Sequence, residues 1–408
     1  MITMKLLIVL LALISGVYSV ILEIVRYRSA GNPTPANVAD VYDAETYGTW
    51  KRYSAEHCRL GIASAAVTCA VTLLLLCTNA YAAFAALFPA FFAWQLISAI
   101  LLETLIGMVI TTVFSYISTM VIEQKYGFNR STLKTFIFDR IRSTLLGLAI
   151  GMFLTGLVFL FYTWMGYWMI VLVACAVFAF TLLISFLYPI TSRIGNKFTP
   201  LEDGELKDRL MELLDSHGYK VKAIEVMDAS RRTTKLNAYF TGLGKTKTIV
   251  LFDNLLNAMS PDEICAVFAH ELGHGLHKDV TKMQIMNIGN LVLMAVVAFI
   301  TVDNPALHTA FGFTEVNYGF AYILMGVLLS LIQPFTGMLM NAYSRKAEYR
   351  ADRQAVREGY GEAMTAALKK LARDNFAHLA PSPVNVVLEY SHPPLSRRIE
   401  EVEKAMKE

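Results

Sequence analysis

The residues of this chain whose types and spacing predict chemistry most clearly are His270, Glu271 and His274, in the sequence Phe-Ala-His-Glu-Leu-Gly-His over 268–274. Positions four apart lie on one face of an α-helix, so both imidazoles can reach the same ion, one Zn²⁺ per chain. Glu271 would then lie beside an open coordination position, where its carboxylate can accept a proton from water. Ser260-Pro261-Asp262-Glu263 has the pattern of an N-cap, a first-turn proline and a capping-box glutamate, so we expect a helix to begin there.

A third ligand is expected among the histidines and carboxylates. The five cysteines include no C-x-x-C pair, and we interpret them as small core residues without disulfides. His277 is rejected as a ligand because it lies seven residues after His270, about 10 Å further along the helix axis, which is too far for both to bind one ion.

The downstream segment 341–352 offers Glu348 and Asp352, which are four residues apart and share a helix face. The HExxH helix leads into one predicted membrane span and the next span returns the chain to the same side, so Glu348 can meet the two histidines. Two histidines and one glutamate leave a fourth position for water, as in a catalytic rather than a structural zinc site. The alternative is a solvated helix face on which the two carboxylates pair with neighbouring arginines.

The composition predicts a membrane protein. Hydrophobic residues make up 55% of the 408 residues, charged residues 17%, and the mean hydropathy is +0.47. Seven apolar runs are long enough to cross about 30 Å of hydrocarbon as helices. They are Leu6–Ile24, Leu60–Leu76, Phe84–Ser118, Thr144–Thr163, Trp168–Tyr188, Ile285–Thr301 and Tyr318–Met340. The third run is long enough to be a tilted helix or a pair of helices broken near Pro89 or Gly107, which would make eight spans. The first is interpreted as an uncleaved span rather than a removed signal peptide.

The lysines and arginines predict the topology. All of them except Lys5 lie in 25–59, 119–143, 189–284 or 341–408. Seven spans place these four segments on one side of the membrane, which the positive-inside tendency identifies as the cytoplasm, and in a bacterium the membrane would be the inner one. The net charge of +3 therefore reflects topology and gives no reason to expect nucleic acid as a partner.

The combination of motifs resembles the integral-membrane zinc proteases that include the type I CAAX prenyl endopeptidases, and we identify the chain as a prokaryotic-type member. The matching segments run in the family's order over about 60–400. Besides 270–274 and 341–352 they are Val121–Thr132, Lys235–Gly242, Ile249–Asp253 and Ser391–Ile399. Two departures leave the substrate open: Gly275 stands where the eukaryotic enzymes carry a bulky aromatic residue, and the loop between the last two spans is short.

The resemblance implies a helical barrel around a water-filled chamber that the zinc helix closes on the cytoplasmic side. Glu103, within an apolar run, would face this water or pack against a hydroxyl group inside the helix bundle. The resemblance further implies that His392 hydrogen-bonds the oxyanion of the reaction, with Arg398 supporting the same region. Asp352 would orient a ligating imidazole. Asn237 and Ala238 resemble the edge strand to which an extended substrate adds, with an ordinary sheet edge as the alternative.

The sequence thus predicts an all-α polytopic membrane protein with a small cytoplasmic α+β zinc-protease portion. Its expected parts are five spans in 1–188, an α+β segment with the HExxH helix in 189–284, two spans in 285–340, and a cytoplasmic helical segment in 341–408. The α+β segment is expected to contain a helix over Leu201–His217 and strands at Val221–Met227, Asn237–Phe240 and Thr248–Phe252, with a turn at Gly242–Gly244.

The predicted activity is zinc-dependent hydrolysis of peptide bonds near the cytoplasmic face of the bilayer, in peptide or protein substrates that are prenylated or not. The CAAX-type reaction would remove a C-terminal tripeptide. One alternative is a quality-control protease of the HtpX type. A non-catalytic zinc-containing binding protein is another, although binding alone would not need Glu271.

Overall fold

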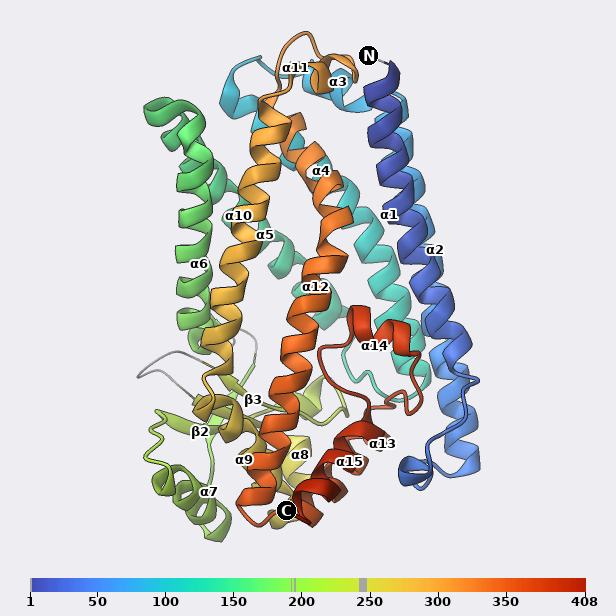
Figure 1. Cartoon of the computed structure of the whole chain (residues 1–408), viewed down its shortest axis with the longest axis vertical. Helices are drawn as coiled ribbons and strands as arrows, with labels where there is room; N and C mark the ends of the chain where they lie inside the picture. The colour runs from blue at the N-terminus through green and yellow to red at the C-terminus, as the bar shows by residue number, and fades with distance from the viewer. Residues whose placement is uncertain (1, 192, 194–195, 242–247) are drawn as a thin grey trace.

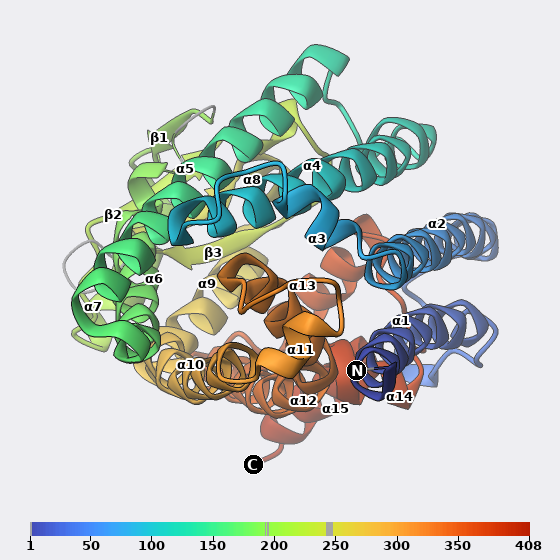
Figure 2. The ribbon, with the colours of Figure 1, turned by 90° about the horizontal axis from the view of Figure 1, so that it is seen from above.

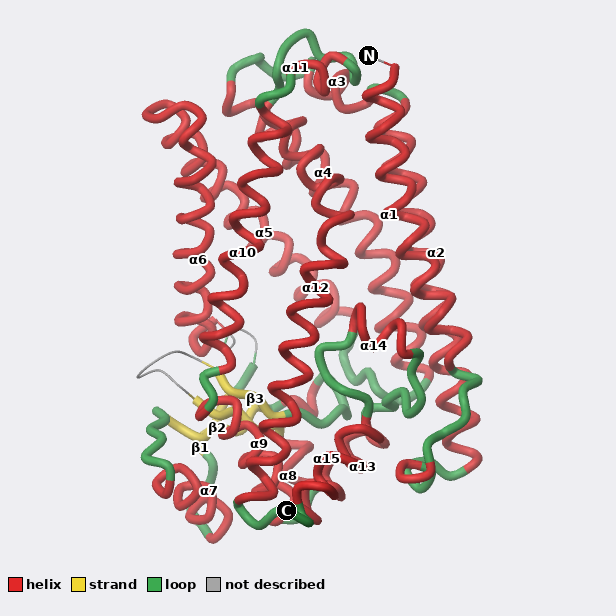
Figure 3. The backbone as a smooth tube through the Cα atoms, in the orientation of Figure 1, coloured by secondary structure: helices red, strands yellow, loops and turns green. Residues whose placement is uncertain are grey.

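The computed structural model describes residues 2–191, 193, 196–241 and 248–408. Seven long helices dominate the described chain (Figures 1 and 3). They are α1 (Ile2–Ser29), α2 (Ala44–Cys77), α4 (Phe92–Tyr116), α5 (Leu133–Met165), α6 (Met169–Thr191), α10 (Asp279–Val302) and α12 (Tyr318–Arg357). Five of these, α1, α2, α4 with its continuation, α10 and α12, are long and apolar enough to cross a membrane by length and composition. These helices confirm the predicted fold class.

Short helices and a small sheet occupy the two ends of this bundle. The short elements are α3 (Ala80–Ala85), α7 (Glu205–Ser216), α8 (Asp253–Ala258), α9 (Pro261–Leu276), α11 (Pro305–Thr309), α13 (Gly361–Asp374), α14 (Pro383–Glu389), α15 (Leu395–Ala405), the 3₁₀ turns η1 (Ala36–Val38), η3 (Gly166–Trp168) and η4 (Ala229–Arg231), and the strands β1 (Phe198–Pro200), β2 (Ala223–Met227), β3 (Ala238–Thr241) and β4 (Thr248–Phe252). The N-terminus, α3 and α11 lie at one end, and the sheet with α7, α9, α13 and α15 lies at the other (Figure 1).

The third apolar run contains a break without an eighth span. Residues 86–91 separate the six-residue α3 from α4, and α4 continues without interruption through a π-helical segment, η2 (Ile117–Glu123). Six residues are too few to cross hydrocarbon, so the break near Pro89 marks a short helix at the end of the bundle. The predicted pair of spans is therefore wrong and the single long helix is right.

The long helices form a ring when the molecule is seen along the bundle from the N-terminal end (Figure 2). Residues of α1, α2, α4, α10 and α12, together with Tyr81 of α3, line an interior cavity of about 650 Å³. Glu103 borders this cavity and accepts a hydrogen bond from the Tyr81 hydroxyl at 2.9 Å. Glu103 therefore borders a cavity and also has the hydroxyl partner that was expected as the alternative.

The sheet has the order β1-β2-β4-β3, in which β2 and β4 are parallel and the outer strands are antiparallel to their neighbours. Strand β4 has the predicted bounds, and β2 and β3 lie within one or two residues of them. Strand β1 was not predicted, because three residues are too short for a period-two pattern. The predicted turn at Gly242–Gly244 lies outside the described residues.

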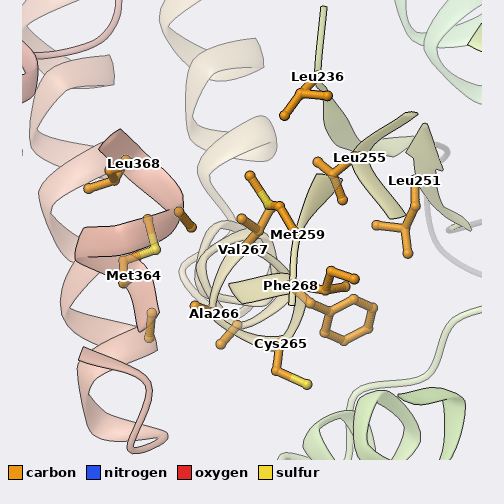
Figure 4. Packing of buried hydrophobic residues seen from close by; sticks show 14 of the residues in the cluster. Leu236, Leu251, Leu255, Met259, Cys265, Ala266, Val267, Phe268, Met364 and Leu368 are labelled. Atoms are coloured by element: carbon orange, nitrogen blue, oxygen red, sulfur yellow. The ribbon is translucent and has the colours of Figure 1, made fainter. Parts of the chain in front are cut away.

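The largest hydrophobic core lies at the sheet end and surrounds α9. Figure 4 shows Phe268 and Cys265 of α9 beside side chains of the sheet and α8, with Met364 and Leu368 of α13 on the other side. Phe268, Cys265 and Leu272 are fully buried, so α9 is a central helix and has little freedom to move.

Candidate metal centre and active site

Helix α9 carries the first two candidate ligands and begins where the sequence predicts. The Ser260 hydroxyl accepts from the Glu263 backbone N–H at 3.3 Å, and the Ser260 backbone N–H donates to the Glu263 carboxylate at 2.7 Å. This capping box satisfies two helix-end donors, and the buried apolar face fixes the rotation of the helix about its axis. His270 and His274 consequently point towards α12, with their ring centroids 4.8 Å apart.

Helix α12 approaches α9 closely at Gly273. A Cβ atom at this position would lie 3.0 Å from the Cα of Ala351 and 3.0 Å from the Cβ of Gln354, so a side chain at 273 would push the two helices apart. The same approach brings Glu348, one turn before Ala351, against the two histidines. The glycine in the HExxH motif is therefore part of the assembly of the site.

Three side chains form a cluster whose dimensions fit a tetrahedral metal ion. Glu348 Oε1 lies 3.3 Å from His274 Nε2, and Glu348 Oε2 lies 3.6 Å from His270 Nε2. One ligand atom from each residue falls within 4.8 Å of the others. Ligands about 2.0 Å from a tetrahedral ion are separated by about 3.3 Å, so an ion between these atoms needs only small adjustments. Oε2 of Glu348 is buried and lacks a hydrogen-bond partner, as expected of an atom reserved for a metal.

The other nitrogen of each imidazole is held by a carboxylate. Asp352 Oδ1 lies 2.8 Å from His270 Nδ1, and Asp279 Oδ2 lies 3.1 Å from His274 Nδ1. Asp279 also accepts hydrogen bonds from the Tyr343 hydroxyl at 2.8 Å and from Arg350 at 2.7 Å. These contacts place the protons on Nδ1 and leave both Nε2 lone pairs facing the cluster, which is the arrangement that metal-binding histidines require.

The C-terminal segment adds Arg398 and His392 to the cluster. Arg398 donates to both oxygens of Asp352 at 2.6 and 2.9 Å, and its Nη1 lies 3.3 Å from Glu348 Oε2. His392 Nε2 lies 3.3 Å from Glu348 Oε1, and the side chain is 63% exposed, whereas Glu348 is buried. Arg398 is thus packed against the cluster, and His392 lies on its solvent-exposed side.

The charges of the cluster favour a bound cation. Burial by itself would lower the pKa of His274, but hydrogen bonds to Asp279 and Glu348 outweigh it and raise the pKa to about 10. With Glu271, whose charge acts in the same direction, three carboxylates create a strong preference for positive charge around His274, which a divalent metal ion can supply. Burial also raises the pKa of Glu271, although the adjacent histidines act in the opposite direction.

Strand β3 lies at the edge of the sheet, and within the described ranges one of its sides is unpaired from Ala238 onwards. The Asn237 carbonyl accepts from Phe252 of β4, and in an antiparallel pair the peptide groups alternate in direction, so those of Ala238 point to the free edge. Leu236 lies two residues before Ala238, and its peptide groups are already occupied: its N–H donates to the Asn375 side-chain oxygen at 2.9 Å, and its carbonyl accepts from the Asn375 side-chain nitrogen at 3.1 Å. A strand added here would therefore begin to pair at Ala238.

Some functional neighbours were not predicted from the sequence. Asp279 was overlooked, although a ligand such as His274 needs an acceptor for its second nitrogen, and an acidic residue five positions later was the available signal. Gly275, the departure from the family pattern, is covered by Tyr219: a Cβ atom at 275 would lie 2.4 Å from the Tyr219 hydroxyl oxygen. His277 lies at the C-cap, where Nδ1 is 2.8 Å from the Gly273 carbonyl, and is outside the three-residue cluster, as expected.

Two family models match most of the chain. Peptidase family M48 matches residues 200–406, and a model described as "CAAX prenyl protease N-terminal, five membrane helices" matches residues 23–192. The chain is 35% identical over 309 residues to CAAX prenyl protease 1 of Saccharomyces cerevisiae. This alignment covers 70% of the chain and 67% of the yeast protein. It is 28% identical over 373 residues to the Homo sapiens homologue of CAAX prenyl protease 1. This alignment covers 78% of the present chain and 76% of the human protein. The crystal structure of S. mikatae Ste24p superposes with a TM-score of 0.91 at 29% identity, covering 98% of this chain and 99% of that one.

Proposed function

The chain belongs to peptidase family M48, with the membrane region of the CAAX prenyl proteases, and from this we propose that it is a zinc endopeptidase that cleaves C-terminal peptides next to a prenylated cysteine. As a member of this family, the chain is an integral, multi-pass membrane metalloendopeptidase. The choice of zinc, the prenylated substrate, the side of the membrane and the residue roles are the proposal.

The observation that carries the proposal is the convergence of His270, His274 and Glu348 with one side open towards His392. A three-ligand His₂Glu set with an open position is the donor set of catalytic zinc peptidases. Zn²⁺ held there would supply Lewis acidity, which acidifies water and polarises a carbonyl group. The donor set contains no thiolate, and the two imidazoles and one carboxylate suit zinc.

The proton transfers are assigned to Glu271. Its carboxylate accepts a proton from the attacking water and delivers it to the leaving amine, so the same group acts as base and then as acid. The raised pKa of Glu271 brings the two protonation states closer in free energy near neutral pH, which favours both steps.

The substrate strand and the oxyanion are assigned to β3 and His392. An extended peptide pairs with the free edge from Ala238, beside Asn237, and β3 packs against α9. The exposed imidazole of His392 donates a hydrogen bond to the oxyanion that develops on the cleaved carbonyl. Asp352 orients His270, and Arg398 acts by holding Asp352 and Glu348 in place.

The metal end of the bundle is assigned to the cytoplasm. The arginine- and lysine-rich segments gather at this end, whereas in the described part of the chain Lys5 is the one such residue at the opposite end, where its Nζ donates to Asn79 Oδ1 at 2.6 Å. This distribution follows the positive-inside tendency. In a bacterial cell the membrane would be the inner one.

The test offers the purified protein, loaded with zinc, a farnesylated peptide ending in a CAAX sequence and the same peptide without the farnesyl group. We expect release of the C-terminal tripeptide from the farnesylated peptide at a higher kcat/KM. Glu271→Gln is the matched control: it should retain one zinc per chain and lose at least ~10²-fold in rate. Cleavage of both peptides at equal kcat/KM would contradict the CAAX assignment and favour a protease for general membrane-protein turnover. Absence of cleavage by the zinc-loaded protein would refute the proposed enzyme mechanism.

A further inference from the structure

A groove on the surface of the helix ring lies between α4 and α5 and has no place in the proposed peptidase reaction. Its volume is about 480 Å³. We call it the α4–α5 groove, and the residues that line it are Met108, Val109, Thr112, Val113, Phe136, Ile137, Arg140, Ile141, Thr144 and Leu145. Seven of these ten side chains lack a charge or a hydroxyl group, so the wall is mostly apolar.

The α4–α5 groove faces away from the interior of the ring. Glu103 lines the interior cavity, and Thr112 follows it by nine residues, which is two and a half helical turns and places Thr112 on the opposite face of α4. Val109 is 61% exposed and Leu145 is 60% exposed, although both are apolar and belong to long apolar helices. The groove therefore opens to the hydrocarbon of the bilayer, where an apolar wall has an apolar neighbour.

Arg140 places a positive charge in this groove. Its Nη2 donates to the Thr111 hydroxyl at 2.8 Å, and its Nε is buried without a hydrogen-bond partner. Among the described residues, no carboxylate lies within ion-pair distance of Arg140, because its neighbour Asp139 pairs with Arg232 instead. A buried guanidinium N–H without an acceptor is costly, so the site is incomplete until an anion or another acceptor occupies it.

The position of Arg140 along α5 places it at the level of the phospholipid headgroups. Asp139 contacts Arg232, which belongs to the segment at the metal end, outside the apolar spans. The uncharged part of α5 begins only three residues later, at Ser143. The groove thus runs from a guanidinium at the headgroup level to apolar side chains at the depth of the acyl chains.

We propose that the α4–α5 groove binds one anionic phospholipid, with its phosphate on Arg140 and an acyl chain along the apolar wall. The buried Nε can meet a phosphate oxygen when the side chain turns towards the groove, and the planar guanidinium can then hold the phosphate through two N–H groups. Lys134 and Arg142 on the same helix add positive charge, which disfavours the ammonium group of a zwitterionic lipid and favours a net negative headgroup. Basic pockets between membrane helices bind anionic headgroups for these reasons.

The test measures lipid retention by native mass spectrometry of the full-length protein taken from vesicles of equal parts phosphatidylglycerol and phosphatidylcholine. We expect one retained phosphatidylglycerol per chain, preferred over phosphatidylcholine by about tenfold, which corresponds to about 1.4 kcal/mol. Arg140→Gln should abolish the preference. Arg28→Gln removes a charge from the same end of the bundle, at the last turn of α1, outside the groove, and should preserve the preference.

A second variant separates the site from general effects on folding. Leu145→Trp fills the apolar wall and keeps Arg140, so we expect it to lose the retained lipid while the peptidase rate stays unchanged. Equal retention of the two lipids by the wild-type protein, or the same preference in Arg140→Gln, would overturn the proposal. Displacement of phosphatidylglycerol by one equivalent of a farnesylated peptide would also overturn it, because the groove would then belong to the substrate. The lipid-retention readouts do not depend on cleavage, so the proposed peptidase function can fail independently of them.

Discussion

The close approach of α9 and α12 predicts that Gly273→Ala weakens metal binding without replacing any ligand. The added Cβ would lie 3.0 Å from atoms of Ala351 and Gln354, about 0.5–1.0 Å below an ordinary carbon–carbon contact. Neither obstacle is the end of a flexible side chain, because one is the Cα of Ala351 and the other is a Cβ atom. The two helices must therefore separate by several tenths of an ångström.

The separation acts on Glu348, which is three residues before Ala351 on the same rigid helix. Metal–ligand distances tolerate only about ±0.2 Å, so a shift of this size misplaces the third ligand. Changes that disturb the support of a metal ligand typically lower metal affinity about 10- to 100-fold, and we expect the same range here. The fold itself should lose less, because overpacking costs about 1–3 kcal/mol while alanine gains up to about 1 kcal/mol over glycine in a helix.

The assay is competitive zinc titration against a chelator, with thermal unfolding measured in parallel. Gly337→Ala is the matched control, because this glycine lies in α12, the partner helix of α9, and a Cβ atom there meets nothing within 4 Å. We expect normal zinc affinity in the control and reduced affinity in Gly273→Ala. Unchanged zinc affinity in a folded Gly273→Ala protein would show that the helix spacing does not position Glu348.

Three further predictions concern other parts of the structure. Asp279→Asn should lower zinc affinity about 10- to 100-fold in the same titration, because His274 loses the carboxylate on its Nδ1, and full affinity would remove Asp279 from the site. Burial lowers the pKa of His378 to about 4, and its neutral ring lies 2.8 Å from the Ser29 hydroxyl. The folded state is therefore stabilised fully above pH 6.5, the approximate pKa of histidine in the unfolded chain, and this stabilisation is lost as the pH falls towards 4. Between pH 7.5 and 5 the loss should be roughly 2 kcal/mol, seen as a fall in melting temperature that His378→Gln does not show. A single cysteine at Lys207 should react with an impermeant thiol reagent only from the cytoplasmic side, and one at Asn304 only from the opposite side. Labelling of both from the same side would contradict the crossing of the membrane by α10.

The sequence predicted the fold where its signals were local. The capping box at Ser260, the strand at Thr248–Phe252 and the long apolar runs each depend on residues close together in the chain, and the structure has all of them. Strand β1 was missed because its three residues carry no pattern of their own and pair only with β2.

The residues of the site could be predicted only in part, because some of their contacts are local in the chain and others join distant segments. The spacing of His270 and His274 is a property of one helix, whereas the contact of Glu348 with them depends on a hairpin through the membrane and on packing at Gly273. The partnership of Arg398 with Asp352 joins residues 46 positions apart, and only the resemblance to a family suggested that they belong to one region. The role of Tyr219 beside Gly275 had no sequence signal, because it is a contact between distant segments.

The division of the metal site between α9, α12 and α15 has a consequence for the order of biosynthesis. The ribosome completes His270 and His274 before the last two spans exist, so the nascent chain at that stage has two ligands and no third. Glu348 is made only with α12, after α10, and Arg398, which holds Asp352 and lies near Glu348, is made later still. With the proposed ligand set, we therefore expect the chain to be inactive on the ribosome and during insertion, and to gain metal and activity only when the segment that contains Arg398 has packed against α9 and α12.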